Sequence, residues 1–216
     1  MNFFRPHKTV PNTPWTGSHT WDLAAIRIII LSVGLFIFGI GDSLVIQSTL
    51  GNAPWSVLAQ GISGQLNISI GSATLLVSAV VLVMWLPLRE RPGFGTIMNI
   101  LIIAGAIDIG IWLFPSPTEF LLQLTFVFLG IAMVGAGSAL YITCGLGPGP
   151  RDGWMTALHK RTGVRVGRVR LAIELAVLTL GWFLGGTVGL GTALFALFIG
   201  HSVAISFGVV SRLTTR

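Results

Sequence analysis

The sequence predicts an all-α membrane protein with six transmembrane helices. These form two inverted three-helix repeats, each carrying a short helix that begins at a Gly/Pro turn. Two observations carry the prediction. Of the 216 residues, 53% are hydrophobic and only 9% are charged, whereas a soluble domain has about 25% charged residues. The chain also reads as one sequence written twice, 96 positions apart. Together with a mean hydropathy of +0.85, the composition indicates a protein that lies in the lipid bilayer.

The repeat covers most of the hydrophobic part of the chain. Residues 34–103 align with residues 130–199 without a gap, and the two segments share 18 identities in 70 positions, seven of them glycine. The turn Leu50-Gly51-Asn-Ala-Pro54 returns as Leu146-Gly147-Pro-Gly-Pro150. Because an internal repeat determines how a fold is assembled, we expect two structurally similar halves.

The boundaries follow from the apolar runs. Six runs are long enough to be spans, at about 28–47, 71–88, 96–114, 121–143, 171–186 and 190–210. We therefore expect a single membrane domain, with repeat 1 at 27–114 and repeat 2 at 121–211. Residues 1–26 contain three prolines and no apolar core, so they are expected to form a polar cytoplasmic tail.

Orientation follows from the positive charges, which accumulate on the cytoplasmic side of membrane proteins. With the N-terminus inside, the outward loops contain no Lys or Arg, and all 13 basic residues are cytoplasmic. The prediction is a multi-pass protein of the inner membrane with both termini in the cytoplasm. Each repeat holds three spans, an odd number, so the second repeat is expected to enter the membrane from the opposite side.

An inverted repeat is common in secondary transporters, where exchanging the conformations of the two halves opens the site to either side. Duplication without any transport role is the alternative, since fold-level analogy alone does not establish function. Our leading hypothesis is a small-molecule transporter or exporter with its site at the repeat interface. The second hypothesis is a membrane scaffold or accessory protein that assists another enzyme or a secretion pathway.

After each Gly/Pro turn comes a segment too short to span, at 54–66 and 150–161. Proline suits the first turn of a helix because its missing N–H is not needed there. The candidate substrate or ion site includes the start of both segments, namely Pro54, Ser56, Pro150 and Asp152. The glycines expected to shape the turns are Gly51, Gly147 and Gly149.

Two interpretations of these short segments stay open. In one, both are re-entrant helices whose N-termini, with free N–H donors and partial positive charge, face a shared site for an anionic or carboxylate-bearing ligand. In the other, both are amphipathic helices that lie flat on the two membrane surfaces. The charges of the second segment, among them Arg151 and Lys160, favour the surface for that copy.

At the second turn the sequence resembles a known family. The run GLGPGPRDG at 145–153, followed by WMTAL and then Thr162-Gly163, is similar to the signature of the YczE/YitT-type bacterial membrane proteins, as is the basic run at 165–170. The shorter, YczE-like branch is the better match, because the chain ends at Arg216 without the C-terminal domain of YitT-type proteins. The resemblance implies a multi-pass protein of the bacterial inner membrane, and it supplies no substrate or site residues.

Polar side chains within spans complete the candidate site. An acid in hydrocarbon is costly unless it pairs, protonates or faces water, so Asp42 and Asp108 are candidates, and His201 is a third. For each, a structural role is the alternative: hydration for Asp42, a packing hydrogen bond for Asp108 and His201. Arg165, Arg168 and Arg170 are expected first to set topology and to bind lipid headgroups.

Several classes of function are not expected. A strongly basic chain suggests nucleic acid only where a soluble body presents a basic face, and this composition provides none. The sequence contains no phosphate-binding loop, no metal-ligand cluster and no catalytic constellation, so we expect no enzyme activity, cofactor or metal. Because six spans enclose a limited cavity, a homodimer remains a hypothesis.

Overall fold

The helices of the structure repeat with the 96-residue period of the sequence. The structure, a computed structural model, describes residues 9–214, which form eight α-helices and a short 3-10 helix and contain no strand. The elements are α1 Ala25–Gln47, α2 Pro54–Leu66, α3 Ile70–Val83, η1 Leu86–Leu88, α4 Phe94–Leu113, α5 Phe120–Thr143, α6 Pro150–Thr162, α7 Val166–Phe183 and α8 Leu190–Thr214. Helices α2, α3 and α4 begin 96 positions before α6, α7 and α8. Residues 1–8 of the predicted tail and residues 215–216 lie outside the described residues.

Within residues 9–214, five segments are long and apolar enough to cross a membrane, namely α1, α3 together with η1, α4, α5 and α8. The chain is therefore a multi-pass membrane protein. The predicted fifth span is α7, whose 18 residues include Arg168, Arg170 and Glu174. These charges keep α7 out of the group that length and composition alone identify as spans.

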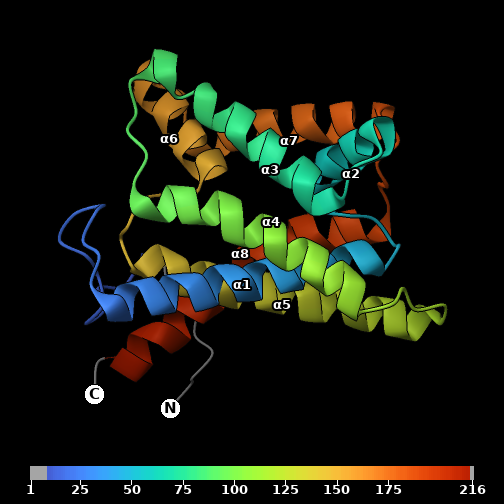
Figure 1. Cartoon of the computed structure of the whole chain (residues 1–216), viewed down its shortest axis with the longest axis horizontal. Coiled ribbons are helices and arrows are strands. Elements are labelled where there is room, and N and C mark those ends of the chain that lie inside the picture. The colour runs from blue at the N-terminus through green and yellow to red at the C-terminus, as the bar shows by residue number, and fades with distance from the viewer. Residues whose placement is uncertain (1–8, 215–216) are drawn as a thin grey trace.

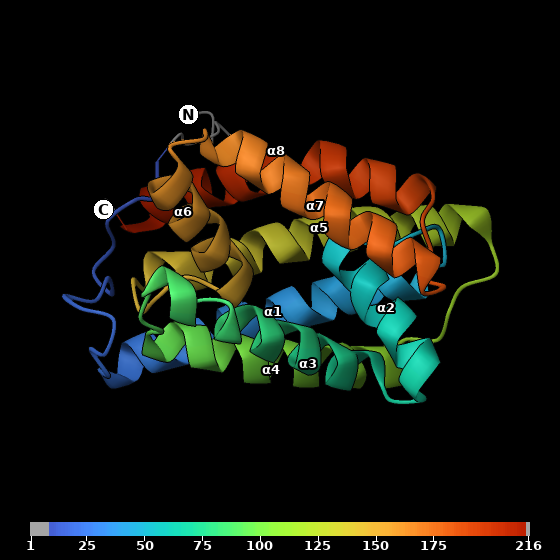
Figure 2. The ribbon, with the colours of Figure 1, turned by 90° about the horizontal axis from the view of Figure 1, so that it is seen from above.

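The helices pack in two groups. Helices α2, α3, α6 and α7 lie on one side of the molecule and α1, α5 and α8 on the other, with α4 between them (Figure 1). Within their group, α2 and α6 lie toward opposite ends of the bundle (Figure 2). Residues 9–24 and the end of α8 lie at one end of the bundle, and the turn between α4 and α5 lies at the other.

Contacts between the two halves come in exchanged pairs. Helix α2 packs on α7, and the equivalent pair α6 and α3 also pack on each other. The backbone N–H of Gly95 donates to the carbonyl oxygen of Leu146 at 2.7 Å, and 96 positions later the N–H of Gly191 donates to the oxygen of Leu50, also at 2.7 Å. Each half therefore holds the Gly/Pro turn of the other.

Glycines of the repeat let α1 and α5 approach closely. Gly34 faces Gly137 and Gly41 faces Gly130, and a Cβ atom on Gly34 would lie 3.0 Å from the backbone oxygen of Gly137. Small residues at such crossings allow the backbones of membrane helices to touch. The α1–α5 pair lies at the centre of the fold, where Leu31 and Leu35 of α1 are fully buried in a core that also contains Ile103 and Ile107 of α4.

The two Gly/Pro turns require glycine for their backbone conformation. Gly51 has a φ of 111° and Gly147 a φ of 115°, a region that side chains with a Cβ rarely adopt. A Cβ atom on Gly51 would also overlap the backbone of Gly189. Two of the three predicted turn glycines, Gly51 and Gly147, are thus fixed by conformation and by contact, whereas Gly149 has a φ of −59°, which other residues can adopt.

Candidate functional site

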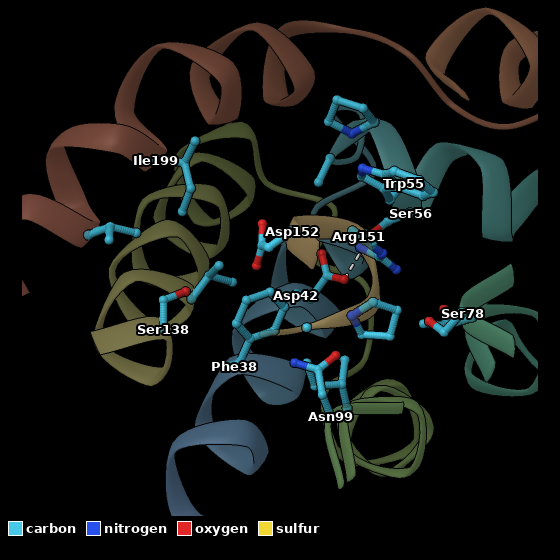
Figure 3. Close-up of a pocket in the computed structure, with 18 of the residues that line it drawn as sticks. Phe38, Asp42, Trp55, Ser56, Ser78, Asn99, Ser138, Arg151, Asp152 and Ile199 are labelled. Atoms are coloured by element: carbon cyan, nitrogen blue, oxygen red, sulfur yellow. Dashed lines mark hydrogen bonds between the residues drawn. The ribbon is translucent and has the colours of Figure 1, made fainter. Parts of the chain in front are cut away.

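A cavity of about 230 Å³ lies between the two halves. Twenty of its lining residues form ten pairs whose members are 96 positions apart, such as Asp42 with Ser138, and Ser56 with Asp152. The close-up in Figure 3 shows side chains from both halves facing this space. The cavity therefore lies where the two repeats meet.

The two short helices begin at this cavity. Pro54, Trp55 and Ser56 of α2 line it together with Pro150 and Arg151 of α6. Neither helix has a side chain that caps its N-terminus, so the first backbone N–H groups have no partner within their own helix. The last turn of each helix is exposed, with the basic end of α6 reaching Glu90 through Lys160 at 2.9 Å. In the first turn of α2, Trp55 and Ser56 are buried, whereas in the first turn of α6 Pro150 is buried and Asp152 is exposed.

Asp42 is the buried carboxylate of the site. Its side chain is 3% exposed, and its Oδ2 accepts a hydrogen bond of 2.8 Å from the hydroxyl of Ser56, which is the dashed line in Figure 3. Its other oxygen, Oδ1, has no hydrogen-bond partner among the described residues. Buried carboxylate oxygens are nearly always paired, so this unpaired oxygen needs explaining.

A second carboxylate lies on α6 at the position equivalent to Ser56, 96 residues later. Asp152 accepts a hydrogen bond of 2.9 Å from the hydroxyl of Tyr141 on α5. Each half thus has one hydrogen bond between a carboxylate and a hydroxyl that joins its long helix to its short helix, although Tyr141 lies three residues after Ser138, the position equivalent to Asp42. In one half the acid is on the long helix and the hydroxyl on the short helix, while in the other half the acid is on the short helix.

The charge of Arg151 favoured the surface interpretation of its segment, and in the structure the side chain of Arg151 lines the cavity. The guanidinium lies over the ring of Trp55, 4.9 Å from the ring centroid. Desolvation lowers the pKa of Arg151, and the nearby carboxylates of Asp42 and Asp152 oppose this shift. Because the arginine pKa begins far above neutrality, the group stays charged. The sequence did contain one indication that Arg151 could face the site. It follows Pro150 at the start of a segment that was a candidate re-entrant helix.

Helix α7 adds an ion pair to the cavity wall. Arg170 and Glu174 both line the cavity, and their side chains are 2.8 Å apart. Arg170, which was expected first to set topology and to bind lipid headgroups, thus also takes part in an ion pair of the cavity wall. Arg165 and Arg168, at the start of the same helix, are exposed and do not line the cavity.

Two predicted site residues lie elsewhere. Asp108 accepts hydrogen bonds from the hydroxyl of Ser69 at 2.6 Å and from the backbone N–H of Gly71 at 2.7 Å, both at the start of α3. Both of its oxygens are therefore occupied, which fits the structural alternative. His201 is exposed on α8 and does not line the cavity.

Replacing Asp108 with alanine is expected to destabilise the protein by about 1–2 kcal/mol, the usual cost of losing an N-terminal cap. The start of α3 would lose two acceptors on a neighbouring helix, while the cavity would keep all of its side chains. Thermal unfolding of the purified protein in detergent measures the effect. Glu119→Ala is the matched control, because Glu119 is exposed and its side chain caps nothing. Equal melting temperatures for the two variants would contradict the capping role.

Comparison with known proteins adds the family. Residues 25–207 match the model of a family described as "Family of unknown function (DUF6198)". The chain belongs to this family. The match covers α1 to α7 and the larger part of α8, so it includes sequence from both repeats.

The chain is also similar to proteins of Haemophilus influenzae and Bacillus subtilis. The chain is 42% identical to an uncharacterized protein of Haemophilus influenzae over 206 residues, covering 95% of this chain and 94% of that one. It is 31% identical to the uncharacterized membrane protein YczE of Bacillus subtilis, covering 77% and 79%. A second Bacillus subtilis protein, YyaS, is 26% identical over 186 residues, covering 83% of this chain and 92% of YyaS. No solved structure matches the chain. The predicted resemblance to YczE-like membrane proteins is confirmed.

Proposed function

We propose that this protein is a small-molecule transporter or exporter of the bacterial inner membrane, with its binding site in the cavity between the two repeats. The observation that carries the proposal is the pairing of the cavity wall, because ten pairs of lining residues are related by the 96-residue repeat. A site shared by two exchangeable halves is what alternating access requires.

The six-span inverted architecture is part of the proposal. Helix α7 is the one span added to the five long apolar segments, fifth in chain order, and its 18 residues are about 27 Å long, close to the thickness of the hydrocarbon core. Its ion pair lines the cavity, while Leu171, Leu175 and Leu180 are exposed on its surface. A span with polar groups toward a cavity and leucines toward lipid is consistent with the cost of charge in a membrane.

The arrangement of the short helices supports the same mechanism. In transporters, broken helices bring their N-termini to a site near the middle of the membrane. Here α2 and α6 begin at one cavity and extend toward opposite ends of the bundle (Figures 1 and 2). Each would connect the site to one side of the membrane.

The topology can be tested by labelling single cysteines in a Cys144→Ser background, since Cys144 is the chain's one cysteine and is buried. Thr118 lies in the turn between α4 and α5, Val164 lies between α6 and α7, and both are exposed. In intact cells a membrane-impermeant maleimide is expected to label Thr118→Cys and to leave Val164→Cys unlabelled until the membrane is opened. Labelling of both residues from the same side would exclude the inverted repeat.

Transport itself can be tested at Ser138, which lines the cavity and is 6% exposed. In the same background, Ser138→Cys is expected to react with an impermeant thiol reagent from outside in right-side-out vesicles and from inside in inverted vesicles. Reaction from both sides indicates alternating access. If the residue reacts from neither side, the accessory role is favoured over transport.

A further inference from the structure

One carboxylate oxygen of the cavity wall has no hydrogen-bond partner among the described residues. This oxygen is Oδ1 of Asp42. The residue is 3% exposed, and its other carboxylate oxygen already accepts a hydrogen bond from Ser56. Leaving a buried acceptor unpaired costs about 1–3 kcal/mol, and more for a charged group. The oxygen is therefore positioned to accept a hydrogen bond from an N–H donor of a ligand.

The same wall contains unpaired donors. The guanidinium of Arg151 stacks on Trp55, and no described residue accepts a hydrogen bond from it. The starts of α2 and α6 are uncapped, so they present free backbone N–H groups and the positive ends of two helix dipoles. A planar guanidinium beside free helix N–H groups suits a carboxylate, which accepts two hydrogen bonds from such a fork.

The charges of the cavity sum close to zero. Three carboxylates, Asp42, Asp152 and Glu174, face two guanidinium groups, those of Arg151 and Arg170. Each of the two helix N-termini adds about half a positive charge, which offsets the excess carboxylate. An anion alone would leave Asp42 unpaired, and a cation alone would leave Arg151 unpaired. A ligand with one positive and one negative end satisfies both groups without adding net charge.

Resting on the proposed function, we propose that the cavity binds a neutral amino acid as a zwitterion. Its ammonium group donates to Oδ1 of Asp42, and its carboxylate accepts from Arg151 and from the N-termini of α2 and α6. The cavity of about 230 Å³ corresponds to about eight water molecules at roughly 30 Å³ each, which limits the ligand to a small one. Apolar lining residues, including Phe38 and Ile199, suit a short aliphatic side chain.

The test compares ligands that differ by one charged group. Calorimetry on the purified protein would measure L-valine against isovalerate, which lacks the amine, and isobutylamine, which lacks the carboxylate, after a screen of the twenty common amino acids. We expect valine, or another small neutral amino acid, to bind at least tenfold more tightly than either of its one-charge analogues. Equal binding of an analogue, or no binding by any amino acid, would overturn the inference.

Two variants test which residue binds the ammonium group of the ligand and which binds its carboxylate. Asp42→Asn is expected to remove the preference for valine over isovalerate, and Arg151→Lys to reduce the preference for valine over isobutylamine. Asp108→Asn is the matched control, an acid on a span that does not line the cavity, and is expected to keep both preferences. If the Asp42 variant does not fold, the wild-type comparison alone still decides.

The result is separable from the proposed function. If Ser138→Cys reacts from both sides of the membrane and no amino acid binds, transport stands and the zwitterion is wrong. If Ser138→Cys reacts from neither side, the proposed function fails whatever the calorimetry shows. Protection of Ser138→Cys by valine, and not by isovalerate, would support the zwitterion directly.

Discussion

Valine in place of Gly51 is expected to lower stability by about 4 kcal/mol and to leave most of the protein aggregated on size-exclusion chromatography. The backbone at this position has a φ of 111°, which costs about 1–3 kcal/mol for a residue with a Cβ. The new side chain would also overlap the backbone of Gly189, beside the hydrogen bond from Gly191 to Leu50. A further 1–3 kcal/mol or so is typical of such overpacking. Since proteins are stable by only about 5–15 kcal/mol, the loss would be severe.

Two other glycines separate the causes. Gly185 has a φ of 99° and nothing within 4 Å of its Cβ position, while Gly64 has equally open space and an ordinary helical backbone. Gly185→Val therefore measures conformation alone, and Gly64→Val provides the baseline. The equivalent Gly147→Val should behave like Gly51→Val because it has the same exchanged contact. If Gly51→Val lowers the melting temperature no more than Gly185→Val does, the packing of the two halves on each other does not depend on this turn.

Replacing Arg151 with glutamine is expected to destabilise the protein by about 2 kcal/mol. No salt bridge joins Asp42 to Arg151 among the described residues, so the cost of about 3–5 kcal/mol for breaking a direct buried charge pair is an upper bound for this change. Asp42 is 3% exposed and acts on the charge of Arg151. Since Arg151 is only half-buried, solvent screening reduces the expected cost.

Neutralising Asp42 at the same time should restore stability. In the double variant Asp42→Asn with Arg151→Gln, no uncompensated carboxylate remains at this position, so at least half of the lost stability is expected to return. Melting temperatures of the wild type, both single variants and the double variant form the double-mutant cycle that isolates the pair. If the stability change of the double variant equals the sum of the changes in the two single variants, the charge of Arg151 does not compensate the charge of Asp42. The charges of the cavity would then be balanced in another way.

Much of the fold could be predicted because the repeat and the apolar runs are long. The short helices begin at Pro54 and Pro150 as expected, because proline marks a first helical turn. The spans around Asp42 and Asp108 are also present. What the sequence could not give is rotation about each helix. The spans are apolar on nearly all sides, so Asp42 and Asp108 look alike in sequence, although one faces the cavity and the other caps α3.

The candidate site was only partly predictable for a related reason. Five of the predicted residues, Asp42, Pro54, Ser56, Pro150 and Asp152, line one cavity, while Asp108 and His201 do not. The charge of Arg151 favoured the surface interpretation because charge alone does not say which end of a short helix is buried. Its partner Trp55 lies in a different repeat, 96 positions away, and contacts between repeats leave no local pattern in sequence.

The stacking of Arg151 on Trp55 has a consequence for the origin of such a site. The two residues occupy equivalent positions of the two halves, since they are 96 apart, and they touch across the cavity wall. In a dimer of two identical three-helix chains, an arginine at this position would meet its own copy, and the two like charges would repel. Joining both copies in one gene removes that restriction, so one half can hold the cation and the other the ring that receives it.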